Sequence, residues 1–215
     1  MAHPPSDRTL VRRLPKRGAY DRQTVDAILD EGLVCHLGIV VDGEPRVLPT
    51  AYARDGDRLL LHGSRTSHSM RALAGGATAC VTVTLLDGLV LARSTFHHSM
   101  NYRSVVVYGV AREVVDRAEK VEALRVLVEH LVPGRSAEAR GPSDAELAQT
   151  TVVALPLDEA SAKVRTGGPV DDVEDHDLPV WAGVVPFVLA AGEPLDDDVV
   201  APGAPVPAYA ASYHR

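Results

Sequence analysis

Three Asp-Gly pairs constrain the fold of this 215-residue chain more than any other feature of its sequence. They stand at Asp42-Gly43, Asp55-Gly56 and Asp87-Gly88, and each separates two runs rich in apolar and β-branched residues. Asp-Gly favours the two-residue turn of a β-hairpin, because that turn needs positive φ at its central residues. Three such turns predict a mainly β domain in which neighbouring strands run antiparallel.

Eight segments are expected to form strands around these turns. Segment 33–41 is apolar enough to be buried on both faces. Pro49 predicts a sheet edge, a bulge or an interrupted ladder, and Gly109 predicts a bulge or a close-approach point. The expected strands are 33–41, 46–52, 58–62, 79–86, 89–94, 104–115, 151–157 and 180–189.

Helical periodicity is confined to a few segments at the periphery. Asp21 can cap a helix that ends at Gly32, and two short helices are expected after Ser67 and Ser143. A further helix follows Asp116 and is expected to bury five apolar residues, which are Val121, Leu124, Leu127, Val128 and Leu131. The prediction is a mainly β fold with three or four short peripheral helices, arranged as a closed or split barrel.

The chain is long enough for one domain with flanking segments. We predict an N-terminal arm at 1–16, the β-domain at 17–190 and a Pro/Ala-rich tail at 191–215.

Charge and cysteine content narrow the class of protein. The net charge of −7 argues against a nucleic-acid binder, because phosphate backbones attract basic surfaces. Cys35 and Cys80 lie in apolar runs, so we expect reduced core residues and no metal site. The N-terminus lacks an apolar signal core, and no apolar run is long enough to span a bilayer. These features predict a cytoplasmic protein that acts without a membrane.

Two stretches gather polar side chains at strand ends. Segment 94–109 reads S-T-F-H-H-S-M-N-Y-R-S-V-V-V-Y-G and places two histidines, an amide, a phenol and a guanidinium before a β-branched run. Segment 59–73 joins a strand to a hydroxyl-rich helix start, which favours an anion such as a phosphate. The alternatives are an ordinary polar turn in the first case and a capped helix with surface basic residues in the second. Lys163 and Arg165 suit either a solvated edge or an anion contact.

In combination these motifs resemble the pyridoxamine 5′-phosphate oxidase-like family of FMN-binding split β-barrels, in the branch near the nitroimidazole-resistance proteins. The resemblance rests on four segments in order: Pro49-Thr50, L-H-G-S-x-x-S-H-S-M-R from Leu61, H-S-M-N-Y-R-S-V-V-V-Y-G from His98, and S-A-K-V-R-T-G from Ser161. It implies FMN as cofactor and a homodimer in which two subunits share each cofactor site. His68 stands where relatives commonly carry Arg, and Arg71 one turn later can compensate.

The family motifs carry over to particular residues of this chain. The resemblance implies cofactor contacts along three strands and one helix start. They are Pro49, Thr50, Ala51, His62, Gly63, Ser64, Ser67, His68, Arg71, Asn101, Tyr102, Arg103, Ser104, Lys163 and Arg165. His97 and His98, with His62, are the candidate catalytic residues, because neutral imidazole exchanges protons near pH 7.

Three functions follow from the resemblance. The first is an FMN-dependent oxidoreductase that reduces or oxidises a small molecule. The second is a split barrel that holds haem or the deazaflavin F420 instead, with His62, His97 or His98 as axial or proton-handling groups. The third is a flavin-binding module without turnover. No G-x-G-x-x-G fingerprint occurs, so a tightly held pyridine nucleotide is not expected.

Overall fold

Two of the three expected hairpins form, and the third does not. In the computed structural model, which describes residues 3–201 and 203–214, Asp42 and Gly43 both have positive φ and turn the first hairpin. The second hairpin is turned by Gly56 and Asp57, one residue later than predicted. The prediction at Asp87-Gly88 was wrong, because the strand continues through this pair with a bulge.

The bulge at Gly88 has a non-local cause. A Cβ atom on Gly88 would lie 2.6 Å from the carbonyl oxygen of Val185, so glycine is needed where another strand packs closely. The chain reverses later instead, at the 3₁₀ turn η2 (Thr95–His97).

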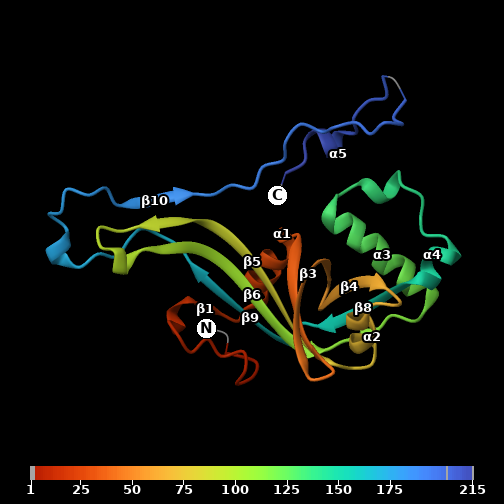
Figure 1. Cartoon of the computed structure of the whole chain (residues 1–215), viewed down its shortest axis with the longest axis horizontal. Coiled ribbons are helices and arrows are strands. Elements are labelled where there is room, and N and C mark those ends of the chain that lie inside the picture. The colour runs from red at the N-terminus through yellow and green to blue at the C-terminus, as the bar shows by residue number, and fades with distance from the viewer. Residues whose placement is uncertain (1–2, 202, 215) are drawn as a thin grey trace.

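The strands form one antiparallel sheet that has the split-barrel arrangement (Figure 1). Its order is β1-β9-β6-β5-β2-β3-β4-β8-β7, and β10 pairs with the outer end of β5. The strands are β1 (Gly18–Ala19), β2 (Val34–Val41), β3 (Glu44–Asp55), β4 (Arg58–Ser64), β5 (Thr78–Leu91), β6 (Ser99–Val110), β7 (Arg112–Glu113), β8 (Thr150–Pro156), β9 (Glu159–Arg165) and β10 (Gly183–Pro186). The mainly β fold predicted from the sequence is confirmed.

Five α-helices occur in the described residues, against the three or four expected. They are α1 (Arg22–Glu31), α2 (His68–Ala74), α3 (Arg117–Leu131), α4 (Asp144–Gln149) and the four-residue α5 (Ala208–Ala211). The side chain of Asp21 caps α1, and Ser143 with Glu146 forms a capping box at α4. None of the helices in the described ranges is long and apolar enough to cross a membrane.

Two apolar cores hold these layers together. The larger lies inside the barrel and takes in the inward residues of β2, β4, β5, β6 and β9 with α1 and α2. The smaller lies between α3 and the opposite face of β4 and β8, around Leu60 and Leu127. Gly109 is a close-approach point, because its Cβ would lie 3.0 Å from Leu155 Cδ1.

Strand β2 departs from its prediction. It alternates between buried and uncovered positions, with Val34 and Val40 about half exposed or more, so it is not buried on both faces. The apolar residues on its outer face have no cover from the described residues of the same chain, although they read in the sequence as core.

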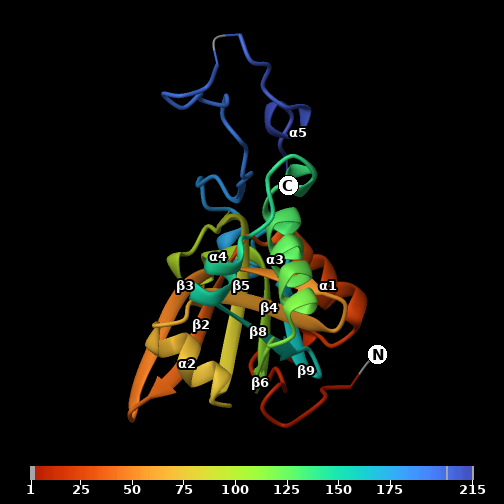
Figure 2. The same ribbon diagram turned by 90° about the vertical axis from the view of Figure 1, so that its right-hand side faces the viewer.

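The arm and the tail lie on different parts of the molecule. The arm runs against β9 and β6, where Arg8 pairs with Glu159 and the Val11 amide donates to the Tyr20 hydroxyl. The tail leaves the sheet after β10, rises off the body and returns to place α5 at the end of α3 (Figures 1 and 2).

Candidate functional site

A large cavity lined by described residues lies under α3, with a volume of about 800 Å³. Helix α3 supplies its apolar wall, the loop between α3 and α4 supplies its outer wall, and β4 contributes a histidine. The lining residues are His62, Val121, Leu124, Arg125, Leu127, Val128, Leu131, Arg135, Ser136, Ala139, Arg140, Gly141, Pro142, Glu146 and Thr150.

This cavity explains a wrong prediction about α3. Of the five apolar residues expected to be buried, only Leu127 is buried in the structure, and Val128 remains 39% exposed. All five line the cavity. The helix therefore has an apolar face wider than the protein core covers, and the uncovered part faces a space large enough for an organic ligand.

His62 reaches this cavity because of strand alternation. Leu61 points into the barrel core, whereas Leu60 packs under α3, and His62 follows Leu60 on that same face. Its Nδ1 atom is buried and has no hydrogen-bond partner in the described part of the chain. Burial lowers the pKa of His62 below its ordinary value, so the imidazole is neutral near pH 7. A neutral imidazole with an unused nitrogen can ligate a metal centre or handle a proton.

Three guanidinium groups stand among the lining residues. Arg125 pairs with Glu122, Arg140 forms two hydrogen bonds with Glu146, and Arg135 donates to the Tyr209 hydroxyl at 2.8 Å. The Arg125–Glu122 and Arg140–Glu146 pairs are about half exposed or more, so these two guanidinium groups can change partners at low cost. Such groups can receive the carboxylates of a ligand whose body fills the apolar space.

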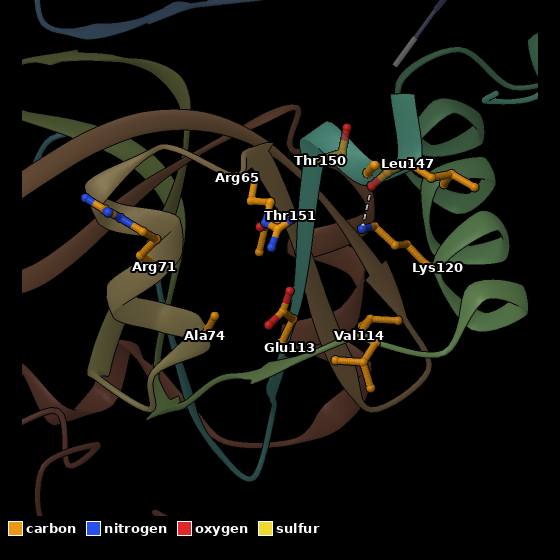
Figure 3. A pocket seen from close by; sticks show the side chains of 11 residues that line it. Arg65, Arg71, Ala74, Glu113, Val114, Lys120, Leu147, Thr150 and Thr151 are labelled. Carbon is orange, nitrogen blue, oxygen red and sulfur yellow. Dashed lines mark hydrogen bonds between the residues drawn. The ribbon is translucent and has the colours of Figure 1, made fainter. Parts of the chain in front are cut away.

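A second cavity of about 400 Å³ lies beside the first and shares Thr150 with it (Figure 3). Its lining is polar and basic, with Arg65, Arg71 and Lys120 against Glu113. The Lys120 ammonium donates to the Leu147 carbonyl at 2.8 Å.

The β4–α2 junction next to this cavity contains the residues expected to bind phosphate. Ser67 caps α2 by accepting from the Met70 amide, and Ser64 hydrogen-bonds Thr66. Gly63 is required here, because a Cβ would lie 2.9 Å from Met70 Cγ. His62, Gly63, Ser64, Ser67, His68 and Arg71 thus occupy one continuous segment, from the end of β4 to the second turn of α2.

Pro49 lies where β3 is an edge. Residues 44–51 pair with β2 on one side, and β4 joins the other side only from Tyr52 onward. The second edge of Pro49, Thr50 and Ala51 therefore has no strand partner in the described ranges. Of the three alternatives predicted for Pro49, the structure shows the sheet edge.

The remaining predicted residues lie on other elements: His97 and His98 at the tip of the long β5–β6 hairpin (Figure 1), residues 101–104 in β6, and Lys163 and Arg165 in β9. His97 Nε2 contacts Asp172 at 3.1 Å, and His98 Nδ1 contacts the Ser94 carbonyl at 2.9 Å. One chain therefore does not bring His97 and His98 together with His62.

The side chains of Asn101, Ser104 and Arg165 already have partners within the chain. The Arg165 guanidinium donates to Asn101 and to the carbonyls of Gly167 and Gly168. Tyr102 pairs in register with Arg165, and the Ser104 hydroxyl donates to the Lys163 carbonyl.

Arg103 joins two carboxylates from different elements. It bonds Glu31 at the end of α1 and Asp87 in β5. Both carboxylates raise the pKa of Arg103 above its ordinary value.

Sequence reasoning missed the α3 cavity and its arginines. The five apolar positions of 117–131 were visible, but they were read as core. Residues 135–142, which form the opposite wall, carry no recognisable sequence motif. Only the path of the folded chain brings them opposite α3.

Comparisons with known proteins agree with this fold. The family model described as pyridoxamine 5′-phosphate oxidase matches residues 21–164. A comparison with curated proteins gave no match.

Three solved structures are similar to the chain. The flavocytochrome Anf3 from Azotobacter vinelandii is 42% identical, with a TM-score of 0.91 and 97% of each chain covered. The FAD and haem binding protein from Mycobacterium smegmatis is 40% identical, with a TM-score of 0.86, covering 90% of this chain and 95% of that one. A candidate 5-nitroimidazole antibiotic resistance protein from Bacteroides thetaiotaomicron is 25% identical, with a TM-score of 0.57, covering 68% of this chain and 86% of that one.

Proposed function

Because the chain belongs to the pyridoxamine 5′-phosphate oxidase family, we propose that it is a redox protein that binds a flavin and also holds haem in the cavity under α3. The sequence favoured a flavin as the sole cofactor and gave haem as an alternative to it. The proposal now combines the two, since the similar structures are named a flavocytochrome and an FAD and haem binding protein.

The observation that carries the haem assignment is the unpartnered Nδ1 of His62 in a cavity of about 800 Å³. Haem is a flat, apolar macrocycle whose iron takes a histidine as axial ligand in many proteins. The apolar side chains of α3 suit the macrocycle, and the neutral imidazole suits the iron. Leaving a buried imidazole nitrogen without a partner is costly, so a ligand that uses it stabilises the fold.

The arginines in the same lining fit the two carboxylates of haem. Arg125, Arg135 and Arg140 come from α3 and from the loop that follows it. Guanidinium groups bind carboxylates in pairs of parallel hydrogen bonds, and the present partners of Arg125 and Arg140 are exposed enough to be displaced.

We place the flavin at the open edge of β3 and the start of α2. Pro49, Thr50 and Ala51 offer unpaired backbone groups, and Gly63, Ser64, Ser67, His68 and Arg71 form a segment rich in hydroxyl and basic groups. FMN is the cofactor expected from the sequence, whereas the relative from M. smegmatis is named for FAD. We therefore propose FAD, and the released flavin decides between them.

A second subunit would complete the flavin site. His97, His98 and the residues Asn101 to Ser104 lie far from α2 within one chain, so a partner must supply them if they act there. The bound groups would supply hydride and single-electron transfer. The chain's own residues would bind these groups, orient the substrate and exclude water from the site. His97 or His98 would exchange a proton with a small-molecule substrate.

The test is the absorption spectrum of the purified chain, repeated after addition of haemin and FAD and removal of the excess. We expect a haem band and a flavin band, each near one per chain, and released flavin that runs as FAD on chromatography. His62→Ala should lose the haem band and keep the flavin. His176→Ala changes an exposed histidine outside both proposed sites; it is the matched control and should keep both bands.

Each other outcome has a definite meaning. Haem retained unchanged in His62→Ala would show that the α3 cavity does not ligate it through this residue. A chain that binds flavin alone, or F420, would instead support one of the single-cofactor functions expected from the sequence.

A further inference from the structure

The outer wall of the α3 cavity is a loop, residues 132–142, that connects α3 with α4. It contains the 3₁₀ turn η3 (Arg135–Ala137), and Arg135, Ser136 and Ala139 from it line the cavity. The loop belongs to no sheet. Its position therefore depends on side-chain contacts.

One set of contacts comes from α3 itself. The Glu129 carboxylate accepts hydrogen bonds from the amides of Gly134 and Ser136 at 2.7 and 2.8 Å. These bonds fix the turn that leaves the helix, where Gly134 has a φ of 91°. They do not reach the far half of the loop.

A second set comes from the C-terminal segment, more than 70 residues away. The Tyr209 hydroxyl accepts from Arg135 at 2.8 Å and donates to Glu138 at 2.6 Å, so it joins two points of the loop. Its ring lies 3.5 Å from the position of a Cβ on Gly134. The Tyr213 hydroxyl donates to the Leu131 carbonyl at 2.8 Å, where the loop begins.

The path of the tail shows that this contact is not a chance crossing. Residues 192–201 rise away from the body, and the chain then returns so that α5 meets the end of α3 (Figure 2). Leu189–Ala191 and Tyr213–His214 line one small cavity with Leu33, so the start and the end of the excursion meet. Helix α5 has only four residues and is too short to be stable alone, so its docking gives it its structure.

We propose that Tyr209 and Tyr213 are positioning residues for the α3 cavity. By holding loop 132–142 in place they keep the outer wall of the cavity closed and slow the loss of the bound group. The inference rests on the proposed function, because haem is the group whose retention is at stake. It adds that the C-terminal segment controls that retention although it contributes no residue to the cavity lining.

The experiment uses the full chain with Tyr209→Phe and Tyr213→Phe combined. Tyr20→Phe is the matched control, since its hydroxyl accepts from the Val11 amide at the N-terminal arm. The first readout is the rate of trypsin cleavage after Arg135 and Arg140 in haem-free protein, assigned by mass spectrometry. The second is the rate of haem transfer from the loaded protein to excess apomyoglobin.

We expect faster cleavage at both loop sites and haem loss about tenfold faster or more, the lower end for three lost hydrogen bonds. Tyr20→Phe should match the unmodified chain in both readouts. Because Phe keeps the ring contact, Tyr209→Ala is the stronger variant, as it removes both hydrogen bonds and the ring that lies against Gly134. A loop that stays protected in Tyr209→Ala would overturn the holding role.

A loop that opens without faster haem loss would overturn the retention role. Failure of the proposed function itself looks different, because the unmodified chain would then take up no haem while its loop cleavage still responded to the tyrosine variants.

Discussion

His62 and Arg103 differ in what their surroundings leave them able to bind. Both were predicted to contact the cofactor, and both are partly buried at the end or start of a strand segment. The Nδ1 of His62 has no partner in the described ranges, whereas the Arg103 guanidinium bonds two carboxylates. A ligand reaching His62 gains a bond without breaking one. A ligand reaching Arg103 must compete with Glu31 and Asp87.

The burial of His62 predicts how stability depends on pH. Its pKa in the folded chain lies below the ordinary 6.5, so the unfolded chain takes up a proton more readily. The haem-free protein should therefore lose stability as the pH falls from about 6.5 through the lowered pKa, and keep this contribution above that range. Urea unfolding across this range should show a smaller pH dependence for His62→Gln. His98→Gln is the control. The role of His62 would be contradicted if the stability of the unmodified chain, His62→Gln and His98→Gln changed equally with pH.

Arg103 should act mainly on stability. Arg103→Ala leaves Glu31 and Asp87 without their shared cation, so we expect a loss of about 1–2 kcal/mol in the free energy of unfolding of the cofactor-free chain. Arg71→Ala removes an exposed side chain and should change the free energy of unfolding by less than about 0.5 kcal/mol. Urea unfolding measures both. If Arg103→Ala kept full stability but lost flavin, the cofactor contact implied by the family would be the better account.

At the scale of elements, the junction of α1, β3 and α3 depends on one glycine. A Cβ on Gly32 would lie 2.6 Å from both the Tyr52 hydroxyl and Val83 Cγ1. Those two side chains are buried, and the Tyr52 hydroxyl donates to the Leu29 carbonyl at 2.6 Å. His130 of α3 contacts the Gly32 carbonyl at 2.7 Å. Three elements therefore meet at a position that has no space for a side chain.

Gly32→Ala should consequently destabilise the fold by overpacking, by about 1–3 kcal/mol. Thermal unfolding should show a lower midpoint for this variant. Gly192→Ala is the control, because nothing lies within 4 Å of its Cβ position. An unchanged midpoint in Gly32→Ala would mean that the junction relaxes at little cost.

The elements also show which parts of the fold the sequence could predict. The hairpin predicted at Asp42-Gly43 forms, because this turn depends only on the positive φ values of these two residues. Asp87-Gly88 failed because β10, about a hundred residues later, determines what happens there. The strand–turn–helix of 58–74 was likewise predictable from local signals, and it brought His62 and Ser67 into one segment.

The α3 cavity could not be predicted in the same way. Leu124 and Val128 carry the same apolar signal whether they face protein or a ligand, and only the position of loop 132–142 distinguishes the two cases. That position depends on Glu129 and on Tyr209 and Tyr213, which are distant in sequence from His62.

At the scale of the whole molecule, the described residues leave one face of the sheet uncovered. On β2 and β3, Val34, Val40 and Val47 point outward and are 49%, 60% and 68% exposed. Register places Val47 opposite Gly38, and Pro49 opposite His36, on this same face. An exposed apolar patch of this kind marks an interaction surface. Since the patch continues into the proposed flavin edge at Pro49, we propose that a second copy of the chain covers it.

Val47→Asp should then separate the subunits and weaken flavin binding together. A carboxylate at the centre of an apolar interface would be buried without a partner, which costs several kcal/mol in the dimer and little in the monomer. Sedimentation analysis should give a dimer for the unmodified chain and a monomer for the variant, with less flavin retained. Val115→Asp changes a residue that is 80% exposed elsewhere and should stay dimeric. If Val47→Asp became monomeric yet kept its flavin, the flavin site would lie within one chain, and His97 and His98 would have no route to it.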